Sequence, residues 1–99
     1  MIGFRLLHLA EDEMFDASSF YAGASPGLGD DFLDDVQYAI DRVRENPTAG
    51  LAIDTDLRRV LFRRFPFSLI YSTDLSTVVV VAIAHQRRRP NYWRRRRDR

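Results

Sequence analysis

The sequence of 99 residues predicts a single α+β domain, in which a helical hairpin packs on one face of a mainly antiparallel four-stranded sheet. Three observations predict this fold. A short alternating run opens the chain, two stretches then place apolar residues at helical spacing, and three later runs are rich in β-branched and aromatic residues. The resulting order is β-α-α-β-β-β, for which the chain is long enough to build one two-layer core.

The first strand is expected over residues 2–6, where Ile2, Phe4 and Leu6 alternate with small or polar residues. A first helix is expected over residues 9–24, because apolar side chains recur there every three to four positions.

Ser25 and Pro26 offer an N-cap and a first-turn proline for a second helix, which Asn46 and Pro47 end. Its apolar stripe consists of Leu28, Phe32, Val36, Ala39 or Ile40, and Val43. The aspartates lie mostly outside this stripe and are expected to form a solvated face; they are Asp30, Asp31, Asp34, Asp35 and Asp41.

Residues 48–56 are expected to form a loop before three further strands, over residues 58–62, 67–73 and 78–83. The last run is apolar without alternation, which indicates a central strand covered on both faces. A hairpin turn is expected at residues 74–76.

The net charge of +1 conceals a strong asymmetry along the chain. Residues 1–56 carry twelve acidic residues against three arginines, a net charge of −9, whereas residues 57–99 carry twelve arginines against two aspartates, a net charge of +10. The second half is therefore expected to form a basic face for an acidic protein or a nucleic acid.

Composition excludes several classes of site. The chain has no cysteine, and its two histidines, His8 and His85, are far apart in sequence, so no metal site and no cofactor is expected. The N-terminus does not resemble a secretory signal and no apolar stretch is long enough to span a bilayer, so a cytoplasmic protein without membrane contact is expected.

The end of the last strand carries the most informative residues. The apolar run stops at His85, and Arg87, Arg88 and Arg89 follow before Tyr92 and Trp93. Imidazole, guanidinium and aromatic groups together are typical of an anion-binding or recognition surface. The domain is expected to span residues 1–93, with residues 94–99 as a basic, disordered tail.

These residues also have structural explanations. Tyr92 and Trp93 can fold the C-terminal segment back onto the sheet, and His85 can hydrogen-bond a neighbouring backbone group. Arg63 and Arg64 can occupy an exposed turn, or can contact carboxylates of a partner.

The chain resembles the RelE/ParE superfamily of bacterial type II toxins over nearly its whole length. The resemblance is carried by an ordered set of runs: SPGLG at residues 25–29, ENP at 45–47, RRVLFRRFPFSLIY at 58–71 and AIAHQRRRPNYW at 82–93. It implies a small toxin that a cognate antitoxin silences by wrapping an acidic or amphipathic C-terminal segment around it.

RelE-like members cleave mRNA on the ribosome, a reaction that needs a general base, a general acid and cations near the phosphate. Leu61, Ser68 and Gln86 stand at positions where that branch has lysine or arginine. Arg59 stands at a further lysine position of the branch and is still basic. Arginine stays protonated and cannot replace lysine as a base.

An RNA-cleaving site in this chain would depend on His85 as the group that titrates near neutral pH, assisted by Arg88 and Tyr92. This RelE-like endonuclease is the alternative hypothesis. A degenerate member that binds an antitoxin without being toxic is a further one.

The substitutions favour the ParE-like branch, whose members keep the fold, lack the nuclease residues and inhibit DNA gyrase. The resemblance then implies a protein-recognition surface for antitoxin or target. Its candidate residues are Arg59, Arg63, Arg64, Arg87, Arg88, Arg89, Tyr92 and Trp93.

Overall fold

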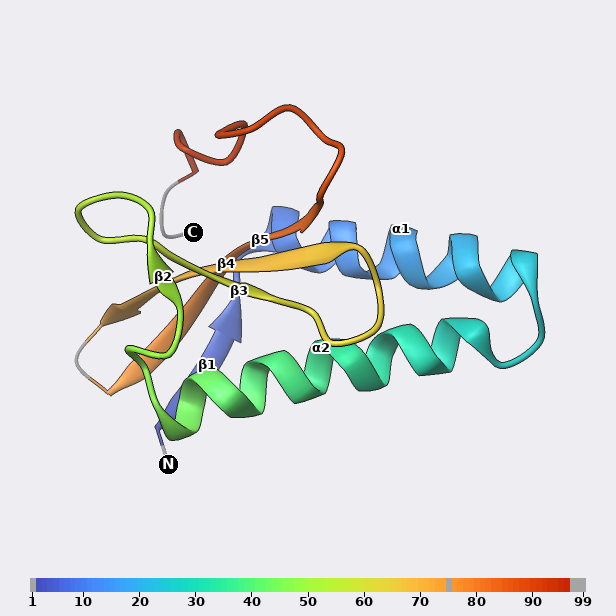
Figure 1. Cartoon of the computed structure of the whole chain (residues 1–99), viewed down its shortest axis with the longest axis horizontal. Helices are drawn as coiled ribbons and strands as arrows, with labels where there is room; N and C mark the ends of the chain where they lie inside the picture. The colour runs from blue at the N-terminus through green and yellow to red at the C-terminus, as the bar shows by residue number, and fades with distance from the viewer. Residues whose placement is uncertain (1, 75, 97–99) are drawn as a thin grey trace.

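Two helices pack on a five-stranded sheet in the computed structural model, which describes residues 2–74 and 76–96 (Figure 1). The α+β class and the order of the main elements are as predicted. In chain order the elements are β1 (Gly3–Leu6), α1 (His8–Ala24), α2 (Leu28–Glu45), β2 (Leu51–Ala52), β3 (Arg58–Leu61), β4 (Phe67–Asp74) and β5 (Thr77–His85).

The sheet has the strand order β1-β5-β4-β3-β2, with β1 parallel to β5 and the other neighbours antiparallel. β5 lies between β1 and β4, which confirms the prediction of a central strand. The expected four strands are corrected to five, because β2 forms inside the predicted loop over residues 48–56. Leu51 and Ala52 pair with Arg59 and Arg58, a ladder too short to leave an alternating pattern in the sequence.

The second helix starts two residues later than Ser25 and Pro26 predicted. Gly27 adopts a left-handed conformation with φ of 81°, and the Leu28 N–H donates to the Ser25 carbonyl. Ser25 and Pro26 therefore belong to the turn between the helices, because a left-handed residue cannot continue a right-handed helix.

Both faces of the sheet are covered. On the helix side, α1 and α2 bury a core that includes Phe32, Val43 and Tyr71. On the opposite face, the chain after β5 folds back over the sheet, and Trp93 packs against a second cluster that includes Ile70 (Figure 1). The predicted return of the C-terminal segment onto the sheet is confirmed.

The packed chain continues beyond the predicted domain end at residue 93. Arg94 forms an ion pair with Asp54, and Arg96 forms one with Glu13 at 2.8 Å. The predicted tail is therefore corrected for residues 94–96, because specific carboxylates bind these arginines. Residues 97–99 lie outside the described residues. Within the described chain, neither helix has the length and apolarity needed to cross a bilayer.

A β-bulge in β5 sets the direction of its last side chains. Ile70 pairs with Ala82 but Tyr71 pairs with Val80, so Val81 is the extra residue. Val81 and Ala82 both face the second cluster, and the alternation is reversed after them. As a result, His85 lies on the helix side of the sheet, against Phe67.

Asp35 is buried, which corrects its assignment to a solvated helix face. Its side chain is 1% exposed and accepts hydrogen bonds from three consecutive backbone N–H groups of the turn between β3 and β4. The donors are Arg63 at 3.2 Å, Arg64 at 2.9 Å and Phe65 at 3.0 Å. The carboxylate is therefore the structural support of this turn.

We expect Asp35→Ala to lower the free energy of unfolding by about 2–4 kcal/mol, because three buried donors lose their charged acceptor. Asp34→Ala is the matched control: Asp34 is exposed on the same helix, so its loss should change stability by less than about 0.5 kcal/mol. Urea unfolding of both variants measures the difference, and equal stabilities would contradict this role of Asp35.

Candidate functional site

One carboxylate binds the C-terminal segment, residues 86–96, at several points. Glu13 of α1 accepts five hydrogen bonds from four residues of the described chain. The donors are the Ile83 N–H at 3.1 Å, Arg88 Nη1 at 3.2 Å, the Tyr92 hydroxyl at 2.5 Å, and Arg96 Nη1 and Nη2 at 2.8 and 3.0 Å.

Glu13 and the side chains bound to it cover the edge of β5 where β1 no longer pairs with it. The pairing with β1 ends at Leu6 and Val80, after which the Leu7 N–H donates to the Val80 carbonyl. Further along, Arg96 Nη1 donates to the Val81 carbonyl at 3.0 Å, while Glu13 accepts from Ile83. An ion pair of two side chains thus satisfies backbone groups that a longer neighbouring strand would bind.

Tyr92 and Arg88 are brought together as the sequence suggested, but the tyrosine hydroxyl is directed at Glu13. The Arg88 guanidinium carbon lies 3.8 Å from the centre of the Tyr92 ring. Burial raises the pKa of Tyr92 well above its usual range, and the hydrogen bond to the Glu13 carboxylate raises it further, against the opposing charges of Arg88 and Arg96. The hydroxyl therefore keeps its proton near neutral pH and serves as a structural donor.

His85 is placed on the helix side of the sheet. Its ring meets the Phe67 ring edge-on with centroids 5.0 Å apart, and its Nδ1 accepts a hydrogen bond from the Arg87 N–H at 3.0 Å. The bond from the neighbouring backbone matches the structural explanation considered for this residue. The hollow in which His85 lies is also lined by Phe20 and Arg88.

The positions at which the sequence departs from RelE-like enzymes lie together on the opposite face of the sheet. Arg59, Leu61, Ser68 and Gln86 line one groove of about 400 Å³, which His85, Arg88 and Trp93 also border. Leu61 is 54% exposed, so the groove presents an apolar surface beside an arginine.

Arg63 and Arg64 lie apart from this cluster, on the turn that Asp35 supports. The Arg63 guanidinium stacks over the Tyr38 ring at 4.1 Å, and Arg64 lies 3.7 Å from the Asp31 carboxylate. Both side chains are thus directed toward α2. Arg87 and Arg89, in contrast, are exposed in the C-terminal segment.

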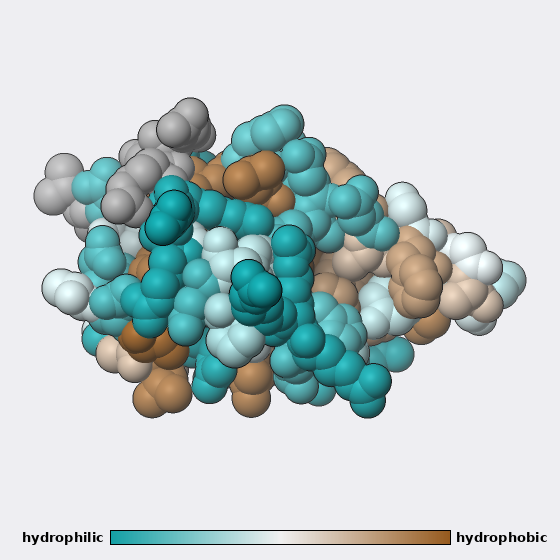
Figure 2. All heavy atoms as spheres, turned by 90° about the horizontal axis from the view of Figure 1, so that it is seen from above, coloured by the Kyte–Doolittle hydropathy of each residue, from teal (hydrophilic) through white to brown (hydrophobic). Residues whose placement is uncertain are grey.

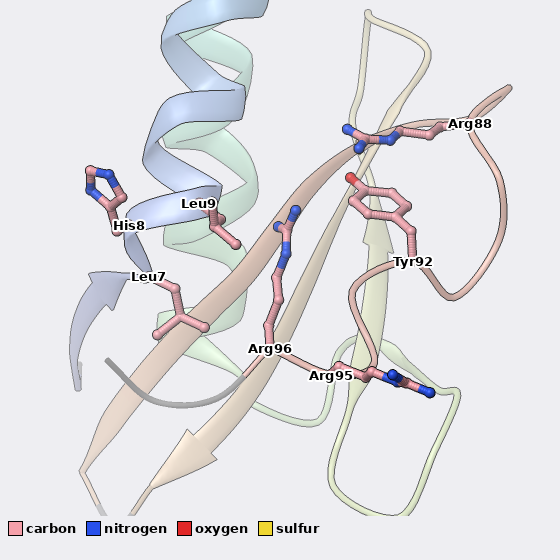
Figure 3. A pocket seen from close by; sticks show the side chains of 7 residues that line it. All are labelled: Leu7, His8, Leu9, Arg88, Tyr92, Arg95 and Arg96. Atoms are coloured by element: carbon pink, nitrogen blue, oxygen red, sulfur yellow. The ribbon is translucent and has the colours of Figure 1, made fainter.

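A second hollow of about 600 Å³ lies between the start of α1 and the C-terminal segment. Figure 3 shows Leu7 and Leu9 on one side of it and the Arg96 side chain rising toward Tyr92 and Arg88, while His8 and Arg95 point away. Among the described residues, no group of three or more histidine and carboxylate side chains could hold a metal ion.

Sequence reasoning missed Glu13 and the role of Arg96. Glu13 stands in an acidic run with Glu11 and Asp12, and its charge alone does not separate it from its exposed neighbours. A weak signal was its position three residues after Ala10, which is fully buried on the side of α1 that faces the sheet.

Comparison with known proteins gives a consistent result. The sequence model of the family described as "ParE toxin of type II toxin-antitoxin system, parDE" matches residues 4–90. The protein named Toxin ParE2 in two strains of Mycobacterium tuberculosis is 28% identical over 82 residues, which cover 82% of this chain and 78% of the relative. A solved structure titled "Chromosomal ParDE TA system from P. aeruginosa" has a chain with the same fold, with a TM-score of 0.63 and 19% identity over 86% of this chain and 96% of that chain.

We expect Tyr92→Phe to reduce stability at neutral pH by about 1–2 kcal/mol, because a hydrogen bond to a carboxylate is lost. Since folding raises the pKa of Tyr92, the contribution of its hydroxyl is fully present below about pH 10, the ordinary tyrosine value, and is lost as the pH rises above it. Urea unfolding at several pH values should therefore show a steeper alkaline loss of stability for the wild type than for Tyr92→Phe. Parallel curves would contradict the proposed environment of the hydroxyl.

Proposed function

The chain belongs to the ParE toxin family of type II toxin–antitoxin systems, and from this we propose that a cognate antitoxin neutralises it and that the free toxin binds DNA gyrase. On this proposal the protein acts in the cytoplasm by blocking a macromolecular target. It is not expected to cleave RNA.

The state of the candidate catalytic groups supports binding over cleavage. The Tyr92 hydroxyl donates to Glu13 and has a raised pKa, which makes it a poor proton donor to a leaving group. The His85 ring packs against Phe67 on the helix side of the sheet, and the residue also lines the groove that holds Leu61 and Ser68. The arginines that line this groove stay protonated and the Tyr92 hydroxyl is bound to Glu13, so among the described residues His85 lacks a partner for general acid–base catalysis there.

The C-terminal segment supplies a suitable surface for a protein target. Seen from the side of this segment, hydrophilic residues cover the middle of the molecule (Figure 2). Arg87 and Arg89 are exposed there, and Arg59, Leu61 and the edge of Trp93 line the neighbouring groove. Exposed arginines beside apolar and aromatic groups are typical of interface hot spots.

The exposed apolar residues of α1 suit the antitoxin. α1 exposes Leu9, Phe15 and Phe20, which are 51%, 53% and 70% exposed. Figure 2 shows apolar residues gathering toward the end of the helical hairpin. An amphipathic antitoxin segment could cover these side chains, with its carboxylates meeting Arg63 and Arg64 on the adjoining turn.

We expect the purified, antitoxin-free protein to trap gyrase on supercoiled plasmid in the presence of ATP, giving gyrase-dependent linear DNA on a denatured gel. His85→Ala should retain this effect, because His85 is not required as a catalyst. If the folded wild type leaves gyrase unaffected but cleaves mRNA on translating ribosomes, and His85→Ala abolishes the cleavage, the RelE-like alternative is correct. Absence of both activities with antitoxin binding intact would indicate the degenerate member.

The double variant Arg87→Ala/Arg89→Ala should weaken gyrase inhibition by at least about tenfold, since each exposed arginine at an interface centre contributes on the order of 1–2 kcal/mol. Its free energy of unfolding should match that of the wild type. Arg42→Ala, which removes an exposed arginine from α2, is the matched control and should inhibit normally. Normal inhibition by the double variant would exclude these arginines from the target surface.

A further inference from the structure

The loop that carries Arg87 and Arg89, residues 86–90, is held by few hydrogen bonds of its backbone. The Gln86 N–H donates to the Pro66 carbonyl at 2.9 Å and the Arg88 N–H donates to the His85 carbonyl at 3.0 Å. Both bonds hold the start of the loop. Beyond them, the contact of Arg88 with Glu13 at 3.2 Å ties the loop to α1.

The returning half of the segment is tied to the same carboxylate. Tyr92 donates to Glu13 Oε2, the oxygen that also binds Arg88, and Arg96 binds both carboxylate oxygens. Arg88 and Tyr92 also stack on each other, and Arg96 lies 5.0 Å from the Tyr92 ring centre. Figure 3 shows these three side chains, from separate points of the segment, converging in the same region. One side chain of α1 thus contacts both arms of the segment, and Asp54 and the second cluster also hold the returning arm through Arg94 and Trp93.

Glu13 performs this role through its charge as well as its shape. Its carboxylate is 12% exposed and offers acceptors alone to two guanidinium groups, a hydroxyl and a backbone N–H. Glutamine has nearly the same volume, but it would replace one acceptor with an NH₂ group that faces other donors. The Arg96 side chain, which is 11% exposed, would also lose this ion pair in a poorly solvated place.

We propose that Glu13 is the positioning residue of the target-binding loop: its carboxylate holds residues 86–96 in the one orientation in which Arg87 and Arg89 meet the target. The inference rests on the proposed function, because it assigns Glu13 a role in target binding that acts through Arg88. Glu13 itself faces the interior of the cluster and need not touch the target.

Glu13→Gln tests this role, with Glu11→Gln as the matched control because Glu11 is an exposed acid on the same helix. Two quantities are measured on the full chain: backbone hydrogen exchange, and gyrase inhibition together with growth arrest on induced expression. For Glu13→Gln we expect exchange in residues 86–96 to become at least about tenfold faster while β4 and the paired part of β5 stay protected, and inhibition to weaken at least about tenfold. Glu11→Gln should behave as wild type in both.

Two results for Glu13→Gln would overturn the inference. One is unchanged exchange in residues 86–96. The other is faster exchange with undiminished activity, which would show that the order of the segment does not serve target binding. A wild type that arrests growth without affecting gyrase would overturn the proposed target alone, and the growth readout then tests Glu13.

Arg88→Gln gives a second test that does not depend on the folding of Glu13→Gln, because the Arg88 side chain is 53% exposed. It should loosen residues 86–90 selectively. The double variant Glu13→Gln/Arg88→Gln should lose no more activity than the more affected single variant, since both residues act through one contact. Additive losses would show that Glu13 does not act through Arg88 and would overturn the inference.

Discussion

The binding of the Glu13 carboxylate to the C-terminal segment is the interaction on which the arrangement of that segment depends. A carboxylate removed from water is costly unless charged donors surround it, and here two guanidiniums, a phenol and a backbone N–H do so. These donors come from β5 and from three points of the C-terminal segment. The hydrogen bonds that the Glu13 carboxylate accepts therefore bring these parts of the chain together. The arginines of the chain's second half therefore fall into two groups. Some, such as Arg96, bind carboxylates within the fold, and others, such as Arg87, are exposed to solvent.

The sheet creates the need for this cluster. β1 pairs with β5 only as far as Val80, and the bulge at Val81 then turns backbone groups toward the uncovered edge. Unpaired strand edges promote unwanted association, and a side-chain ion pair covers this one. The same bulge places the His85 ring against Phe67 on the helix side of the sheet, although the residue still lines the groove that holds Ser68. A local irregularity in one strand thus sets the direction of the last side chain of β5.

Asp35 accepts backbone hydrogen bonds in a similar way at the turn that precedes β4. Its carboxylate accepts hydrogen bonds from three N–H groups of the turn that begins at Arg63. The arginine side chains of this turn lie against α2. The Pro66 carbonyl of the same turn binds Gln86, so the support extends to the start of the C-terminal segment. Two acidic residues on two helices therefore organise the two basic surfaces that we assign to antitoxin and target.

The sequence by itself determined the α+β class, the helical hairpin, the central position of the apolar strand over residues 78–83 and the family resemblance, because each of these depends on periodic or consecutive residues. It also placed Arg88, Tyr92 and Trp93 on one segment that folds back. Only the tertiary structure decided that Asp35 is buried among donors, that the partly buried Glu13 binds several of them, that Arg96 contacts Glu13 and that the His85 ring packs on the helix side. The physical reason is that these features depend on residues distant in sequence. Whether a charge is buried, and on which face of the sheet side chains lie after a bulge, cannot be predicted from the neighbouring residues alone.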